Sequence, residues 1–330
     1  MRVLEKVNSS DIVFLDIETV SVEENLIEGS PLYDAWSYKA RYANELNKKT
    51  GLQFTVEEYF KEKAALYAPF AKIICITVGR IVEQENEPTK IVIKSYQGDD
   101  EKELLENFNN DLGAVCAKNP KTVLCGLNNI GFDEPFVFKR LLIHQIQPTK
   151  ILDNSGLKPW ETTSIDLGKL FQGTSFYPDS LVAIATALGL PSPKDGIDGS
   201  MVTEFYYGGK LEDIVRYCER DVVTTINIFR KFRFEPVIEE IVIRVQKERE
   251  LPAPILQRLY MCNNFTRELA EEFRQLFKDK NLLEEDKEGI EKILIAHYID
   301  KVDVMDMDKK EKKEVNEEKI QEIKDFMSTL

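Results

Sequence analysis

Histidine, clustered basic residues and long apolar runs are all scarce in this 330-residue sequence. No apolar run approaches the ~20 residues that span a bilayer, and residues 1–10 lack the apolar stretch of a signal peptide. The sequence therefore predicts a cytoplasmic protein that does not enter the membrane. Its hydrophobic share of 43% and charged share of 31% are typical of a chain with one large core, or one core plus a smaller helical unit.

The scarcity of histidine and basic residues narrows the chemistry that is open to the chain. Its two histidines, His144 and His297, each lie in an apolar helical context, which argues against histidine-based catalysis or metal binding. The five cysteines are scattered and never form a Cys-x-x-Cys pair, so we predict reduced core thiols. A net charge of -14 argues against broad neutralisation of duplex phosphates, so contact with nucleic acid must be local. Carboxylates remain as the reactive groups.

The order of the predicted elements indicates an α/β fold. Apolar and β-branched runs predict the strands, and helical spacing of apolar residues predicts the helices. In chain order these are strand 11–20, strands 71–83 and 90–96 as a hairpin, helix 99–118, strand 122–127, a helix with Pro135 in its first turn, and helices 180–188, 201–207 and 211–232.

Two further features set the domain organisation. Between the first two strands, Ser30-Pro31 and the capping box Thr55-x-x-Glu58 each indicate the start of a helix. From Pro236 onward the pattern is helical and highly charged. We therefore predict a main domain over residues 1–235 and a helical, charged C-terminal region of unknown role over residues 236–330.

Asp16 and Glu18 lie two residues apart in the first predicted strand. Because side chains alternate across a strand, both acids point to the same face. In so acidic a chain this spacing arises by chance, and its weight comes from its position. An apolar strand seldom carries two like charges on one face unless a cation or solvent lies beside them.

Four more polar residues each have two interpretations. Asp133 follows an apolar strand and a turn, and on its own it reads as an ordinary helix N-cap. Asn128 reads equally as a turn residue. Tyr217 and Asp221 are four residues apart and share one face of a long helix, where they could be a surface pair. Much of that helix is apolar, which favours a buried acid and phenol with a partner.

The combination is more specific than any one motif. Asp-x-Glu, Asn-x-x-x-Phe-Asp and Tyr-x-x-x-Asp follow one another along the chain. In this order they resemble the three motifs of the DEDD superfamily of 3'-5' exonucleases, in its tyrosine-bearing branch. The chain is similar to the proofreading domain of family B DNA polymerases, and more closely to stand-alone predicted 3'-5' exonucleases related to it. The closer resemblance rests on residues 127–136, 180–190, 197–200 and 217–222, within a span of about 11–234.

The resemblance implies a fold and a site. The fold is α/β, a ribonuclease H-like mixed sheet flanked by helices, here with a C-terminal helical extension. The catalytic residues that it implies are Asp16, Glu18, Asp133, Tyr217 and Asp221. The four carboxylates would bind two divalent cations, Mg²⁺ or Mn²⁺, because oxygen ligands select hard cations. The tyrosine would orient the attacking water. Leu127 departs from the related group, which often has a His there, but no carboxylate is affected.

The resemblance also implies a substrate. Thr19, Asn128 and Phe132 would bind the 3' end of single-stranded or frayed DNA, and the product would be a nucleoside 5'-monophosphate. Phe132 and Tyr207 could stack on unpaired bases, with core packing as the other reading of both. Two alternatives stay open. One is a 3'-5' exoribonuclease of the same chemistry, because these motifs do not read the 2'-hydroxyl. The other is a nucleic-acid-binding or scaffold protein with minor activity.

Overall fold

The computed structural model describes residues 4–47, 53–83, 88–158, 161–192 and 199–244, together with Gln321, Lys324 and Asp325. The chain divides into two units, residues 1–246 and 247–330, and the description below concerns the first. Most of the predicted helical region lies outside the described residues, and the boundary near residue 235 stays a prediction. None of the described helices is both long and apolar enough to cross a membrane.

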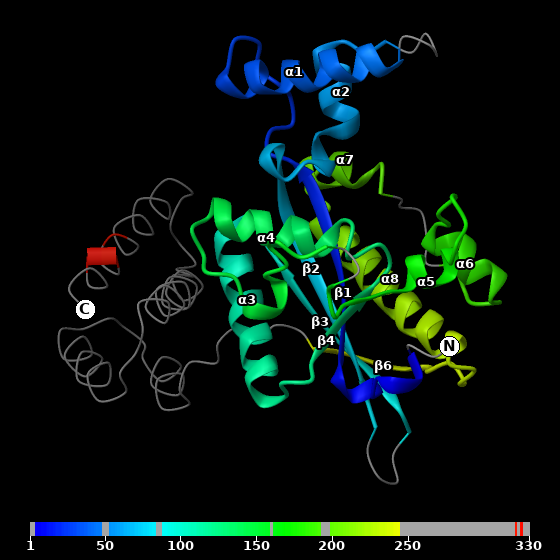
Figure 1. The fold of residues 1–330 in the computed structure, drawn as a ribbon. Coiled ribbons are helices and arrows are strands. Elements are labelled where there is room, and N and C mark those ends of the chain that lie inside the picture. Colours follow the sequence, from blue (N-terminus) through cyan, green and yellow to red (C-terminus); the bar gives the residue numbers. More distant parts are fainter. Residues whose placement is uncertain are drawn as a thin grey trace, which may run out of the picture. The chain divides into compact units, whose positions relative to one another are not determined.

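Six strands form one mixed sheet in the order β5-β4-β1-β2-β3-β6 (Figure 1). The central strand β1 is antiparallel to β2 and parallel to β4, β3 is antiparallel to β2, and the edge strands β5 and β6 run parallel to β4 and β3. The strands are β1 Ile12–Ser21, β2 Ala71–Val82, β3 Lys90–Gln97, β4 Val123–Gly126, β5 Ile165–Asp166 and β6 Glu240–Arg244. The predicted α/β class is confirmed, and the mixed sheet is consistent with a ribonuclease H-like fold.

Helices cover both faces of the sheet, which makes three layers (Figure 1). On one face α3 and α4 pack against Val13, Leu15 and Ile17 of β1. On the other face α5, α6 and α8 pack against Ile12 and Phe14. This alternation along β1 directs Asp16 and Glu18 toward the α8 side. The helices of these layers are α3 Glu101–Lys118, α4 Asp133–Ile143, α5 Leu167–Gln172, α6 Leu181–Ala187, α7 Val202–Tyr207 and α8 Leu211–Phe232.

A buried ion pair fixes α4 to its neighbours. Glu101 at the start of α3 and Arg140 of α4 are both under a tenth exposed and hydrogen-bond through two pairs of atoms. The same carboxylate accepts from the backbone N–H of Ile73 at 2.7 Å, and Arg140 also donates to the carbonyl of Ala68 at 2.9 Å. Removing one partner of such a pair leaves a buried charge uncompensated. The pair therefore holds the C-terminal half of α4 against α3 and β2.

The connection between β1 and β2 forms a small helical insertion with its own core. It contains α1 (Pro31–Leu46), α2 (Val56–Lys63) and the 3-10 turns Ala64–Leu66 and Ala68–Phe70. Trp36 is fully buried and packs against the rings of Phe60 and Phe70. The expected capping box is present at the start of α2. This insertion lies beyond the end of β1, at the same end of the sheet as α7 (Figure 1).

Two strands differ from the expectation. Residues 240–244, within the stretch predicted to be helical, form β6 beside β3. Ile241, Val242 and Ile243 are β-branched, and pairing with an open sheet edge decides the conformation of so short a run. The two-residue strand β5 was not predicted, because it is too short to show a period of its own.

Candidate active site

Strand β1 presents two acids to the side of the sheet that α8 covers. Its apolar residues are buried on both faces, while Glu18 is 9% exposed and Asp16 is half-buried. The pairing with β2 slips by one residue between Glu18 and Thr19, so Ile74 of β2 is the extra residue of a bulge. Bulges bend a strand and re-aim the side chains beside them. The first acid pair therefore stands where the sheet changes direction.

Asp133 reaches the same place from the N-terminus of α4. It is the first residue of that helix and 4% exposed, with Phe132 in the N-cap position. Its Oδ1 accepts a hydrogen bond of 3.1 Å from the backbone N–H of Ile17, the residue between Asp16 and Glu18. The third predicted acid thus contacts the backbone of the strand that carries the first two.

The turn before Asp133 is tightly built. Gly126 ends β4, and a Cβ there would lie 2.8 Å from the Cβ of Asn129 and 2.9 Å from the carbonyl oxygen of Leu15. Asn128 takes a positive φ of 62°, a conformation that Asn adopts more readily than most residues. Its backbone N–H donates to Asp166 at 2.9 Å. Close packing and these bonds hold the turn so that Asp133 faces β1.

A buried carboxylate next to Asp133 completes this support. Glu134 is fully buried and accepts hydrogen bonds from Asn129 at 2.7 Å, Ser164 at 2.8 Å and Asn154 at 3.0 Å. Three neutral donors satisfy its oxygens, which offsets part of the cost of burial. The network ties α4 to the chain around β5.

Helix α8 supplies the remaining predicted residues. Tyr217 and Asp221 are each 8% exposed and lie on the face toward the sheet, as their spacing predicts. The thiol of Cys218, the next residue after Tyr217, donates to the Asp16 carboxylate at 3.3 Å. Burial and a hydrogen bond with Cys75 raise the pKa of the Cys218 thiol well above its usual value, so it stays protonated and able to donate.

The acids raise one another's pKa. Burial contributes most for Asp16, followed by repulsion from Asp133 and Asp221. Burial also leads for Glu18, followed by repulsion from Asp16 and Asp221, so both pKa values lie well above the ordinary range. For Tyr217, burial and then the charges of Asp221 and Glu18 raise the phenol pKa far above 10. The five predicted catalytic residues are therefore close enough to interact electrostatically.

This donor set fits a cation. The ligand atoms of Asp16, Glu18 and Cys218 lie within 4.8 Å of one another. Buried carboxylates whose pKa values are raised by one another lose that repulsion when a divalent ion binds between them. The oxygen donors suit hard cations, whereas the thiol is occupied as a hydrogen-bond donor to Asp16.

The residues predicted to bind substrate differ from one another in exposure and in their contacts within the protein. The Thr19 hydroxyl donates to the carbonyl of Ala65 at 2.7 Å, so it is engaged within the protein. Asn128 is exposed at the turn. Phe132 is partly buried, packs on the ring of Phe136 and joins the core on the α3 side. Tyr207 donates to the carbonyl of Ser21 at 2.8 Å. Their roles toward a substrate stay predictions.

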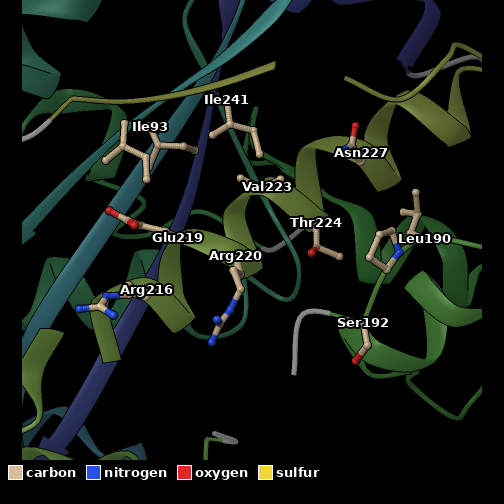
Figure 2. Close-up of a pocket in the computed structure, with 12 residues that line it drawn as sticks. Ile93, Leu190, Ser192, Arg216, Glu219, Arg220, Val223, Thr224, Asn227 and Ile241 are labelled. Carbon is tan, nitrogen blue, oxygen red and sulfur yellow. The ribbon is translucent and has the colours of Figure 1, made fainter. Parts of the chain in front are cut away.

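An apolar pocket of about 400 Å³ lies elsewhere on α8 (Figure 2). Arg216, Glu219, Arg220 and Val223 approach it from the helix, and Ile241 from β6. These α8 positions lie on another side of the helix than Tyr217, Cys218 and Asp221, toward Ile93 of β3 and the edge strand β6. None of the predicted catalytic residues lines this pocket, so it is distinct from the acid cluster.

Sequence reasoning missed three contributors to the site. Cys218 was read only as a core thiol, although it directly follows Tyr217 in the motif. The backbone N–H of Ile17 carries no side-chain signal at all. The network around Glu134 was hidden because Asn154 and Ser164 lie 20 and 30 residues away in the chain.

Burial raises the pKa of Asp133 to about 7, against about 3.9 for an exposed Asp. Between these values the folded protein binds the proton and the unfolded chain does not, so this group destabilises the metal-free protein increasingly as pH rises from about 4 to 7. Asp133→Asn keeps an acceptor for Ile17 without the charge. In chelator, we expect its melting temperature to exceed that of wild type at about pH 8, with a gap that closes toward about pH 4.

Thermal unfolding of both proteins across this pH range measures the effect. Asp153→Asn is the control, because hydrogen bonds from Ser155 lower the pKa of this exposed carboxyl. The control should gain nothing at about pH 8. A melting temperature of Asp133→Asn that equals or falls below that of wild type at about pH 8 would contradict a raised pKa of Asp133 in the folded protein.

Residues 64–244, more than half of the chain, match the family described as predicted 3'-5' exonucleases related to the exonuclease domain of PolB. The matched span holds Asp133, Tyr217 and Asp221 but starts after Asp16 and Glu18. No curated protein matches the chain.

A solved structure also resembles it. The family B DNA polymerase of the hyperthermophilic archaeon Pyrobaculum calidifontis is similar over 68% of this chain, with 14% identity and a TM-score of 0.41. The chain spans 24% of that polymerase. By the family match, the chain belongs to the predicted 3'-5' exonucleases related to the exonuclease domain of PolB.

Proposed function

We propose that this protein is a two-metal-ion 3'-5' exonuclease that shortens single-stranded or frayed DNA from its 3' end and releases nucleoside 5'-monophosphates. The observation that carries the proposal is the meeting of acids from three distant elements. Asp133 accepts a hydrogen bond from the backbone N–H of Ile17, the residue between Asp16 and Glu18. Burial and then the charges of neighbouring acids, Asp221 among them, raise the pKa of both acids of β1. A family of predicted exonucleases matches the chain over the segment that holds the other acids.

In this proposal Asp16, Glu18, Asp133 and Asp221 hold two divalent cations, Mg²⁺ or Mn²⁺. Such a pair of ions supplies charge that activates water and stabilises the leaving oxygen of a phosphodiester. The protein's own acids cannot remain ionised together without it, since two charges 4 Å apart repel by ~4 kcal/mol at an effective dielectric of 20. The four carboxylates would therefore be ionised together only with the cations bound.

Tyr217 has a positioning role. Its raised pKa keeps the phenol protonated at neutral pH, so the hydroxyl donates a hydrogen bond and does not act as a base. It orients the attacking water or the phosphate oxygen beside Asp221. Asn128 and Phe132 line the path of the terminal nucleotide, and the backbone at Thr19, next to the bulge, receives its 3' end.

Replacing either Asp16 or Asp221 by Asn should reduce cleavage by at least about 100-fold, because each removes a charge that the reacting centre requires. The measurement is the shortening of a 5'-labelled single strand with Mn²⁺, read as a ladder, together with the identity of the released nucleotide. Asp153→Asn, an exposed acid away from the cluster, should cleave at the wild-type rate. Wild-type cleavage by Asp16→Asn or Asp221→Asn would refute the proposed site.

The same assay on matched DNA and RNA strands separates the two substrates. A faster rate on RNA would replace the proposed DNA exonuclease by the exoribonuclease of the same chemistry. No cleavage of either strand by the wild-type protein, with Mg²⁺ or Mn²⁺, would leave only the binding or scaffold role.

Tyr217→Phe should lower kcat by about 10- to 100-fold while some activity remains, because a misplaced reactant costs rate without removing the charges. The affinity for Mn²⁺ should be unchanged, since the phenol is not a proposed ligand. Steady-state kinetics of the variant across Mn²⁺ concentrations measure both quantities. A variant as fast as wild type would contradict the positioning role.

Mn²⁺ should raise the melting temperature of the wild-type protein, because an ion that binds only the folded state stabilises it by about 2.7 kcal/mol at 100 times its Kd. The increase should be lost in Asp16→Asn and kept in Asp153→Asn. Differential scanning calorimetry with Mn²⁺ or chelator tests this without any substrate. An equal increase in Asp16→Asn would place the bound ion elsewhere.

A further inference from the structure

The helical insertion between β1 and β2 carries an aromatic pocket that the proposed active site does not use. The pocket has a volume of about 280 Å³. Four tyrosines and one lysine line it, and none of the five is acidic. They are Tyr38, Lys39 and Tyr42 of α1, Tyr59 of α2 and Tyr67.

Two of these rings are unusually exposed. Tyr38 and Tyr42 are 70% and 68% exposed, and their spacing puts them on one face of α1. The guanidinium of Arg41 lies 4.5 Å from the centre of the Tyr38 ring. The surface of the insertion thus presents flat π faces to solvent, with a cation beside one of them.

The inner wall of the pocket is rigid. Tyr59 stacks on the buried ring of Trp36 at 5.3 Å, and Tyr67 meets the same ring edge-on at 5.7 Å. The Lys39 ammonium lies 3.8 Å from the centre of the Tyr67 ring. Among the described residues no carboxylate forms an ion pair with Lys39, so its charge is available to a phosphate.

The pocket is connected to the acid cluster by a short path through the protein. Thr19, next to Glu18, donates its hydroxyl to the carbonyl of Ala65 at 2.7 Å. Tyr67 follows Ala65 by two residues and lines the pocket. Arg140 of α4 also holds the adjoining carbonyl of Ala68. The insertion is therefore anchored at both β1 and α4, the two elements that supply Asp16, Glu18 and Asp133.

We propose that this aromatic pocket binds the unpaired bases and phosphates of the substrate strand upstream of its 3' end. The inference rests on the proposed function and adds a second contact for the same strand. Aromatic faces stack on any base, and an ammonium or guanidinium pairs with the phosphates between them. This mode needs single-stranded nucleic acid, because the bases of a duplex are stacked on one another and have no free face.

A nucleic acid strand fits the pocket better than a peptide does. Aromatic-lined grooves also bind Pro-rich peptides, but such peptides carry no phosphates with which Lys39 and Arg41 could pair. The overall charge of -14 would oppose a strand held by charge alone, and stacking binds without that requirement. The anchoring of the insertion on β1 and α4, which carry three of the proposed acids, favours the substrate strand as the occupant.

The test is the binding of fluorescein-labelled single strands of dT and of U, twelve nucleotides long, measured by anisotropy with chelator present. Replacing both Tyr38 and Tyr42 by Ala should weaken binding by about 10-fold or more. Both side chains are exposed, and a melting temperature equal to that of wild type will verify that the fold is intact. Phe234→Ala is the matched control, because it removes a ring that is 90% exposed beyond the far end of α8. Its affinity should equal that of wild type.

Lys39→Gln provides a second, independent measurement. Loss of one phosphate contact should make the slope of log affinity against log salt shallower by about 0.7. The dT and U strands report whether DNA or RNA is preferred. Wild-type affinity in the tyrosine variant, or an unchanged salt slope in Lys39→Gln, would refute the proposed binding of the strand by this pocket, even if the protein cleaves DNA normally. Conversely, tight binding that depends on the tyrosines, without cleavage by the wild-type protein, would keep the pocket and reject the proposed exonuclease.

Discussion

The hydrogen bond from the Ile17 backbone to Asp133 is the interaction on which the site depends. Strand β4 pairs with β1 only along Ile12–Phe14, so beyond that point the edge of β1 needs another partner. Leaving a buried N–H unsatisfied costs about 1–3 kcal/mol. The Asp133 carboxylate takes that place. The same hydrogen bond therefore completes the backbone pairing of β1 and places a third acid beside Asp16 and Glu18.

Interactions elsewhere in the molecule offset the unfavourable free energy of burying the acid cluster. Burial and mutual repulsion raise the pKa values of the acids of β1, which means that their ionised forms are costly in the folded protein. The compensation comes from elsewhere. The Glu101–Arg140 pair holds α4, three donors satisfy Glu134, and the apolar face of α8 packs across the sheet. Stability is thus concentrated around the site and is low within it, as expected where function requires close like charges.

The sequence predicts the elements that local periodicity determines, and it does not predict those that depend on contacts distant in the chain. The strand of Asp16 and the helix of Tyr217 and Asp221 have strong local periods, and both form within about a residue of the expected bounds. The strand β6 could not be read locally, because the open edge of β3 decides its conformation. The bond to Ile17 and the thiol of Cys218 join residues 116 and 202 positions apart in sequence. No local pattern carries such contacts, whereas the combined order of three motifs indicated which side chains should meet.

The proposed pocket of the insertion would reconcile a strongly acidic chain with a polyanionic substrate. Two like net charges repel at distances up to the Debye length of about 8 Å at physiological salt, so attraction must come from close contacts. Stacking is such a contact, since it acts only when ring and base touch and needs no net charge. Lys39 and Arg41 lie against tyrosine rings, where their charge would pair with a phosphate beside a stacked base. Such a surface favours an unpaired strand over a duplex, because only the unpaired strand offers free base faces. In the proposed role, selection for a frayed 3' end would then arise at the insertion, before the strand reaches the acids.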